Sequence, residues 1–183
     1  MKVTFILPAI GKVAGQPYIK SWQVMEPLPI MTMKAITPPH IETEFFDDRI
    51  ELIRYDTPTD LVAISCETYT AARSYQVAAR FRARGIPVVM GGYHPTLMPD
   101  EVLEHADAIV IGNAETVWAT LLADAGHHRL QRIYRGSPGY SDALPNRGIL
   151  AGKKYARIGL VETGRGCVFN CDFCAITRYY DRH

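Results

Sequence analysis

The stretch LVAISCETYTAARSYQVAARFRARGIPVVM, residues 61–90, decides the fold. It begins with a short apolar run, Leu61 to Ser65, and ends with another, Pro87 to Met90. Between them, apolar residues recur at helical spacing from Thr70 to Arg84, and Gly85 supplies a helix stop. A strand, helix and strand in this order form a right-handed crossover, so the two strands are expected to be parallel. The apolar positions of the helix are Ala71, Tyr75, Ala78 and Phe81.

Three more apolar runs extend this unit into a sheet. They are Val3 to Leu7, Ile41 to Phe45 and Ala108 to Ile111. Each run is too continuous for a half-exposed strand, which suits a parallel sheet covered on both faces. Short helices are expected from Pro99 onward and over Glu115 to Ala125. The sequence therefore predicts a doubly wound α/β domain with a five-stranded parallel sheet over residues 1–135.

The loops after these strands are the expected ligand site, because doubly wound sheets bind ligands beyond the carboxyl ends of their strands. At the end of one strand, Gly91 and Gly92 would let a large flat ligand approach the backbone. Four loops are expected to converge at this edge: Pro8 to Gln16, Cys66 to Tyr69, Gly91 to Pro95 and Gly112 to Glu115.

Composition excludes several classes of protein. The 183 residues include 20 Lys and Arg against 19 Asp and Glu, a net charge of +1. This balance offers no broad electropositive face, so nucleic acid is disfavoured as a partner. No apolar run of about 18 residues is present to span a membrane, and the first apolar stretch breaks at Pro8 without a small-residue cleavage site. We therefore expect a cytoplasmic protein.

The composition changes after the α/β domain. Residues 136–155 are rich in Ser, Pro, Gly and Asn without a periodic apolar pattern, which predicts a linker. A new strand is expected from Ala156 to Val161. It leads into the segment GRGCVFNCDFCA, residues 164–175, which contains three of the four cysteines. The fourth, Cys66, follows a buried strand and is expected to be an inert core residue.

The three clustered cysteines, Cys167, Cys171 and Cys174, have the spacing C-x3-C-x2-C. Three thiolates on one loop can bind three irons of a 4Fe-4S cluster and leave the fourth iron without a protein ligand. A structural zinc site is one alternative, in which His183 could be recruited as a ligand, but such a site usually takes four ligands in two separated pairs. Three cysteines buried as ordinary core residues are the other. The spacing favours the cluster over both.

This motif resembles the radical S-adenosylmethionine (radical SAM) superfamily, through the cysteines, Gly164 and Gly166 before them and the aromatic Phe173. The resemblance implies that S-adenosylmethionine binds the open iron, with Phe173 near its adenine. An electron from a donor such as flavodoxin or ferredoxin would then release a 5′-deoxyadenosyl radical, which abstracts hydrogen from a small-molecule substrate. From the residues alone, Phe173 could instead be a core aromatic, and the two glycines could simply permit a tight loop.

The N-terminal part is similar to the cobalamin-binding domain that precedes many radical SAM barrels. The resemblance rests on GGYHPT, residues 91–96, and IGNAET, residues 111–116. It implies a Rossmann-like or flavodoxin-like domain. The absence of an Asp-x-His-x-x-Gly motif implies that no protein imidazole binds the lower face of the cobalt. The cobalamin contacts it implies are Gly91, Gly92, Tyr93, His94, Gly112 and Glu115.

Two of these contacts have alternatives. His94 can be a hydrogen-bond partner that orders its loop, and Glu115 can be a partner of a helix N-terminus. Taken together, the resemblances imply a cobalamin-dependent radical SAM enzyme, with methylation of an unactivated carbon as the favoured reaction. A non-catalytic cobalamin-binding or scaffold module with an incomplete cluster loop is the alternative.

Residues 156–183 are expected to be the first strand and cluster loop of a truncated radical SAM partial TIM barrel. Because a full barrel takes roughly 200 residues or more, we expect this chain by itself to be inactive.

Overall fold

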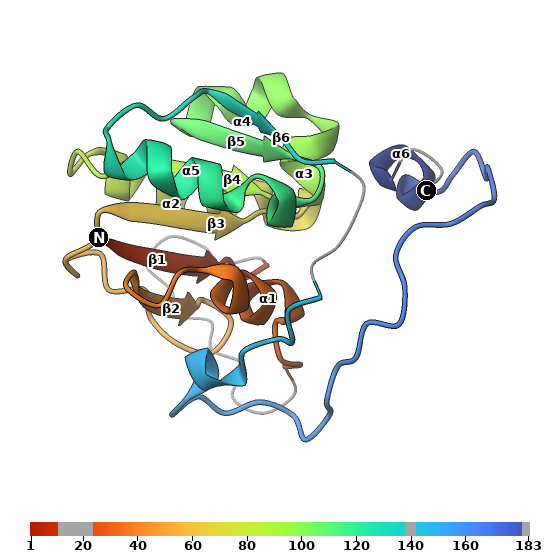
Figure 1. Ribbon diagram of the computed structural model, residues 1–183, viewed down its shortest axis with the longest axis horizontal. Helices are drawn as coiled ribbons and strands as arrows, with labels where there is room; N and C mark the ends of the chain where they lie inside the picture. The colour runs from red at the N-terminus through yellow and green to blue at the C-terminus, as the bar shows by residue number, and fades with distance from the viewer. Residues whose placement is uncertain (11–23, 138–141, 181–183) are drawn as a thin grey trace.

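The computed structural model describes residues 1–10, 24–137 and 142–180. One six-stranded parallel sheet runs through it in the order β2-β1-β3-β4-β5-β6 (Figure 1). The reversal of strand order beside β1 is the mark of a doubly wound fold, and it places the connecting helices on both faces. The strands are β1 (Lys2–Leu7), β2 (Glu42–Asp47), β3 (Leu61–Ser65), β4 (Val88–Gly91), β5 (Ala108–Ile111) and β6 (Ile133–Arg135).

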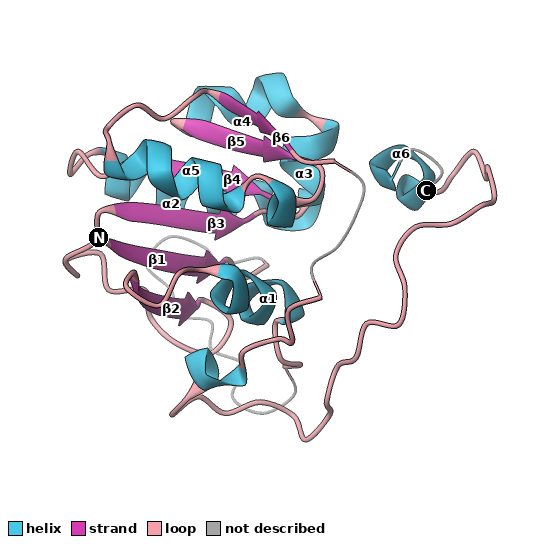
Figure 2. Cartoon of the chain, viewed as in Figure 1, coloured by secondary structure: helices cyan, strands magenta, loops and turns pink. Residues whose placement is uncertain are grey.

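Helices cover both faces of the sheet, and the intervening segments are loops (Figure 2). The α-helices are α1 (Leu28–Ile36), α2 (Ala71–Arg82), α3 (Tyr93–Leu97), α4 (Pro99–His105), α5 (Trp118–Gly126) and α6 (Ala175–Tyr180). The short 3-10 helices are η1 (Thr68–Thr70), η2 (Ala114–Thr116) and η3 (Arg147–Leu150).

The sheet has two separate cores because successive strand residues point to opposite faces. On β4, Val89 packs with α1 and α5, whereas Val88 and Met90 pack with α2 and α4. On β5, Val110 joins the first core and Ile109 the second. The continuous apolar runs of the sequence are therefore explained by burial on both sides.

The sheet has six strands, not the predicted five. The sixth strand, β6, pairs in parallel with β5. It has only three residues, Ile133–Arg135, and one of them is charged, so it lacks the apolar run by which the others were found. Helix α1 also lacked a helical prediction, because Pro27 and Pro29 at its start interrupt the pattern.

No strand forms over residues 156–161, where one was expected. A strand needs a neighbouring strand for its backbone N–H and C=O groups, and within the described residues this segment joins no sheet, although the Ala156 N–H donates to Val24 O. The preceding stretch lies on the domain. The Asn146 amide donates to Met31 O, Leu150 is buried in the core and the Tyr155 hydroxyl donates to Asp47. The boundaries of the predicted linker stay a prediction.

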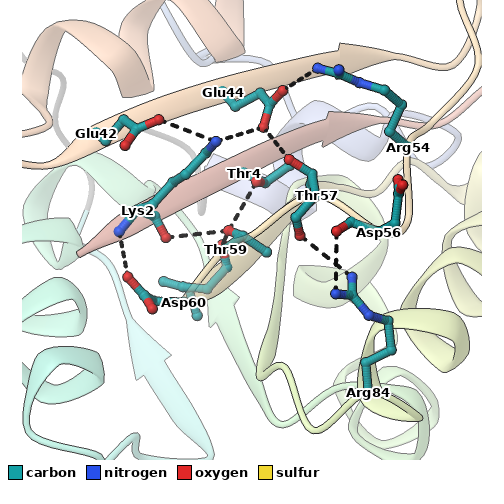
Figure 3. Close-up of polar contacts among 11 residues, drawn as sticks. Lys2, Thr4, Glu42, Glu44, Arg54, Asp56, Thr57, Thr59, Asp60 and Arg84 are labelled. Carbon is teal, nitrogen blue, oxygen red and sulfur yellow. Dashed lines mark hydrogen bonds and ion pairs between the residues drawn. The ribbon is translucent and has the colours of Figure 1, made fainter.

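Charged and hydroxyl side chains form a network at the amino ends of β1, β2 and β3 (Figure 3). The Lys2 ammonium pairs with Glu44 at 2.9 Å and with Glu42 at 3.2 Å. Glu44 also accepts hydrogen bonds from Arg54 at 2.6 Å and Thr57 at 2.8 Å. This end of the sheet is thus held together by paired charges.

Among the residues described, the structure has no helix that is both long enough and apolar enough to cross a membrane.

Candidate functional site

A cavity of about 220 Å³ lies at the carboxyl ends of the central strands, between α1 and the loops after β3, β4 and β5. This is the edge at which the sequence predicts a ligand site. Its floor is apolar and its rim is polar and aromatic, the composition typical of small-molecule sites. The lining includes Phe5, Leu28, Ile30, Thr32, Met33, Ala63, Glu67, Gly91, Gly92, Tyr93, Val110, Gly112, Glu115, Trp118, Glu162, Arg165, Tyr179 and Tyr180.

The cavity floor is rigid. Trp118, the first residue of α5, is buried, and its ring lies 5.9 Å from that of Phe5 on β1. Its indole N–H donates to the Thr37 hydroxyl at 2.9 Å, and that hydroxyl donates to Met33 O in the last turn of α1. Because the indole N–H has a partner, the buried tryptophan leaves no orphaned donor.

Two of the predicted glycines are required by loop packing. Gly92 has φ +115°, and a Cβ there would lie 2.7 Å from Cys66 O. Gly112 has φ +76°, and a Cβ would lie 2.8 Å from Gly136 O. Backbone meets backbone at both places, so a side chain would force the cavity loops apart. Thr96 ties the two loops together, since its hydroxyl donates to Gly92 O and accepts from the Gly112 amide.

The C-terminal segment reaches the rim of the cavity, on the side to which the strands point (Figure 1). The Arg165 guanidinium bridges Glu162 and Glu115. The Tyr179 hydroxyl donates to Gly112 O at 3.1 Å, and its ring lies 4.3 Å from that of Tyr93. The loops after β4 and β5 and the segment that bears the cysteines thus share one rim.

Burial shifts the acid–base properties of rim residues. Desolvation raises the pKa of the Glu67 carboxyl, with the charge of His94 acting in the opposite direction. Desolvation also raises the pKa of Tyr93 to about 12, helped by the neighbouring Tyr180. Both groups therefore hold their protons more tightly than exposed ones do, and the Tyr93 hydroxyl can donate a hydrogen bond into the cavity.

His94 does not join the cavity. His94 belongs to α3, and its side chain is buried. Its Nε2 atom lies 2.9 Å from the Tyr75 hydroxyl and 3.4 Å from Glu101. Tyr75 itself donates to Glu101 at 2.8 Å, so His94 Nε2 is the donor toward the tyrosine oxygen. Its contacts correspond to the loop-ordering alternative. The other predicted cobalamin contacts, Gly91, Gly92, Tyr93, Gly112 and Glu115, all line the cavity.

The three clustered cysteines are accessible. Cys171 is exposed, and Cys167 and Cys174 are partly exposed. Across the described residues, no three His, Cys, Asp or Glu side chains gather as ligands of one metal ion. Phe173 is 92% exposed and touches neither the cavity nor a core. The donor set suits an iron–sulfur cluster in kind, since it offers three unpaired thiols on one segment. The segment would have to close around such a cluster.

Sequence reasoning did not identify several residues that line the cavity. Residues of α1 line the cavity, and the i, i+4 pair Leu28 and Thr32 was a weak signal that Pro29 obscured. Trp118 lay within a predicted helix, but no pattern marked it as a cavity residue. Tyr179 and Tyr180 lie after the cysteine motif, where only the aromatic pair itself could have pointed to a role.

Residues 35–122 match the family model described as the B12 binding domain. The match spans β2 to β5 and so includes the loops after β3, β4 and β5 that line the cavity. This part of the chain is therefore similar to the B12 binding domain, which agrees with the expected cobalamin-binding-like α/β fold, while the predicted domain bounds stay a prediction.

The chain is also similar to curated enzymes. It is 35% identical to bacteriochlorophyllide d C-8(2)-methyltransferase of Chlorobaculum tepidum, over 80% of this chain and 35% of that protein. It is 28% identical to bacteriochlorophyllide d C-12(1)-methyltransferase of the same organism, over 90% of this chain and 38% of that protein. A third relative is anaerobic magnesium-protoporphyrin IX monomethyl ester cyclase of Rubrivivax gelatinosus. It is 30% identical over 64% of this chain and 26% of that protein. The chain spans about a third of the length of these relatives.

Proposed function

We propose that the cavity binds part of a cobalamin and that the chain belongs to a cobalamin-dependent radical SAM enzyme. The observation that carries this proposal is the position of the cavity. It lies at the carboxyl edge of the region that matches the B12 binding domain, and residues on both sides of the three cysteines lie on its rim. This arrangement supports a corrinoid site next to a cluster motif.

The size of the cavity limits what enters it. Pockets for whole drug-sized ligands run from about 300 to 1,000 Å³, so 220 Å³ accommodates only one part of a corrinoid. The apolar floor of Phe5, Val110 and Trp118 suits an aromatic base. The rest of the cofactor would lie over the loops that begin at Gly92 and Gly112, which are the predicted contacts.

Among the described residues that line the cavity there is no histidine. His94 faces α2 and α4 instead. The proposal is therefore a corrinoid without a protein imidazole on its lower face. Bound there, a methylcorrinoid supplies a methyl group. The chain's own residues contribute orientation through the loops and exclusion of water through the apolar floor.

The cysteines are proposed to hold a 4Fe-4S cluster through Cys167, Cys171 and Cys174, with Phe173 near the adenine of S-adenosylmethionine. Thiols that are accessible and free of disulfides can be deprotonated and bind iron. The hydrogen bond from the Thr177 hydroxyl to Phe169 O already folds this segment back on itself at 3.1 Å.

Methyl transfer is the favoured reaction because the two relatives that this chain matches over the largest share of its length are methyltransferases by name. Ring formation is the second candidate, because a cyclase matches the chain at 30% identity. The α/β domain and cavity serve either reaction, since the cofactor carries the hard chemistry.

Two additions to the anaerobically purified chain test the proposal. Hydroxocobalamin should stay with the protein through gel filtration. Iron and sulfide should produce a broad absorbance near the visible blue that is lost in Cys171→Ala, whereas Cys66→Ala keeps it. If zinc binds stoichiometrically and iron and sulfide are refused, the cluster assignment is wrong.

A further inference from the structure

Arg165 connects two parts of the molecule that are far apart in sequence. It lies two residues before Cys167, in the segment that bears the cysteines. Its Nη1 atom reaches Glu115, 50 residues earlier, in the loop after β5 that lines the cavity. Both side chains are largely shielded, with exposed fractions of 16% for Arg165 and 9% for Glu115. Ion pairs in such surroundings are screened less than those on an open surface.

The guanidinium is held in a fixed orientation by a second carboxylate. Arg165 Nε lies 2.7 Å from one oxygen of Glu162, and Nη2 lies 2.8 Å from the other. This two-point geometry sets the plane of the guanidinium and directs Nη1 toward Glu115. Its hydrogen bond with Glu162 is the main reason that the pKa of Arg165 is raised, and the bond with Glu115 adds to it despite opposing desolvation. Arg165 is therefore charged at any pH of interest.

A second anchor follows the cysteines. Tyr179 on α6 donates to Gly112 O at 3.1 Å and packs against Tyr93. Glu115 and Gly112 belong to the same loop after β5, so the cysteine segment is attached to that loop at both of its ends. Both anchors, together with Glu162 and Tyr180, line the cavity.

We propose that Arg165 is a positioning residue: through Glu115 it holds the three-cysteine segment against the cavity loop, so that a corrinoid in the cavity and a metal cluster on the cysteines strengthen each other's binding. The inference rests on the proposed function. Its physical basis is that both ligands favour the same arrangement of one loop, and coupling between two sites is reciprocal.

A simply structural contact would stabilise the chain without coupling the two sites. The ligand-free chain gives the first test, by hydrogen exchange of residues 112–116 and 162–180 in Arg165→Gln, Glu115→Gln and the double variant. Each single variant should exchange about tenfold faster there, and the double variant no faster than either, because all three lose the same pair. The matched control is Arg129→Gln, which removes an ion pair with Asp124 away from the rim. Unchanged exchange in Arg165→Gln would overturn the proposal.

The second test measures the coupling itself. Hydroxocobalamin affinity is determined before and after iron and sulfide reconstitution, with the blue absorbance as the measure of cluster assembly. Reconstitution should tighten hydroxocobalamin binding at least fivefold in the wild-type chain, the lower end of ordinary allosteric coupling. In Arg165→Gln the cluster should still assemble, because the cysteines are intact, but the ratio of affinities should fall to about one. Arg165→Lys should restore part of it.

The outcomes separate the two proposals. An unchanged affinity ratio in Arg165→Gln refutes the positioning role and leaves the proposed function standing. Failure of the wild-type chain to retain hydroxocobalamin refutes the cavity assignment, and hydrogen exchange then decides whether Arg165 positions the segment.

Discussion

The two ends of the sheet are built in opposite ways. At the amino ends of the strands, Lys2, Glu44 and Arg54 satisfy one another within hydrogen-bond distance (Figure 3). At the carboxyl ends, the glycine loops enclose a cavity with a rim of tyrosines and carboxylates. The amino end has these charged groups paired, whereas the carboxyl end keeps a cavity and two glycines at positive φ.

This difference separates stability from function. Paired charges at the amino end contribute to the free energy of unfolding, and their charged groups are already engaged with one another. Gly92 and Gly112 at the carboxyl end have positive φ, which glycine adopts readily and other residues rarely do, and this backbone shapes the cavity loops. We therefore expect substitutions at the amino end to alter stability alone, and substitutions at the carboxyl end to alter stability and ligand binding together.

The largest effect is expected at Gly92. Gly92→Ala combines an unfavourable φ with a Cβ placed 2.7 Å from Cys66 O, and should cost about 3 kcal/mol of unfolding free energy. Urea denaturation measures this loss. The control is Gly91→Ala, whose Cβ would meet Val110 Cβ at an ordinary 3.6 Å and should change stability by less than about 0.5 kcal/mol. Equal losses for both variants would refute the assigned role of Gly92.

Buried Cys66 and exposed Cys171 should differ in reactivity toward alkylating reagents. Burial raises the pKa of the Cys66 thiol from 9.0 to about 11, which leaves roughly a hundredfold less thiolate than an ordinary thiol has. Cys66 is also fully buried, whereas Cys171 is exposed. Iodoacetamide should therefore alkylate Cys171 at least about a hundredfold faster than Cys66, as followed by peptide mass spectrometry at pH 8. Comparable rates would mean that the core beneath the cavity loops opens readily.

A moderate effect is expected from the amino-end network. Burial alone would raise the pKa of Glu44, but hydrogen bonds from Lys2 and Thr57 and nearby positive charges hold it below the usual 4.5. Glu44→Gln should lose about 1 to 2 kcal/mol of stability at pH 7 and leave hydroxocobalamin affinity unchanged. Glu42→Gln, at a largely exposed carboxylate, is the matched control, with a loss under about 0.5 kcal/mol.

The comparison of wild type with Glu44→Gln should also depend on pH. Because the folded-state pKa of Glu44 is lowered, its contribution is fully present above the unfolded value and is lost as pH falls through the folded value. The stability difference between wild type and Glu44→Gln should thus shrink as pH is lowered from 7 to below 4. A difference that grows on acidification would show that Glu44 is not held by these contacts.

A small effect on both stability and binding is expected at His94. Its imidazole faces Tyr75 and Glu101 and does not line the cavity. His94→Gln should therefore lower stability by about 1 kcal/mol while hydroxocobalamin affinity stays within about twofold. Isothermal titration with the variant measures both binding and stoichiometry. A loss of ten-fold or more would return His94 to the list of cofactor contacts.

The sequence predicted the strands and crossover helix well, because burial on both faces leaves continuous apolar runs. The strands at Leu61–Ser65 and Ala108–Ile111 were predicted to the residue, and the helix predicted from Thr70 to Arg84 is Ala71–Arg82. Short elements escaped, because β6 has three residues and α1 begins among prolines. Apolar residues that recur every two positions indicate a strand and every 3.6 positions a helix, and the three residues of β6 are too few to show either period.

The site could be predicted only in part, because a cavity is a property of packing. The glycine loops were recognisable as the ends of strands, and five of the six predicted cobalamin contacts line the cavity. His94 shows the limit, since its sequence neighbours face the cavity and its own ring does not. The bond between Arg165 and Glu115 joins residues 50 positions apart, and no local pattern encodes it.

The most direct test of the central claim is a titration of the chain with hydroxocobalamin, followed by the fluorescence of Trp118 on the cavity floor, with Trp22→Phe introduced in every protein so that Trp118 alone reports. The proteins compared are this reference, here called wild type, and Ala63→Phe. Ala63 lines the cavity, so the added ring fills it, whereas Leu144→Phe adds a ring at a fully exposed site as a control. We predict saturable quenching with one corrinoid per chain in wild type and Leu144→Phe, and at least about a hundredfold weaker binding in Ala63→Phe. Equal binding by all three proteins, or by none, would contradict the account.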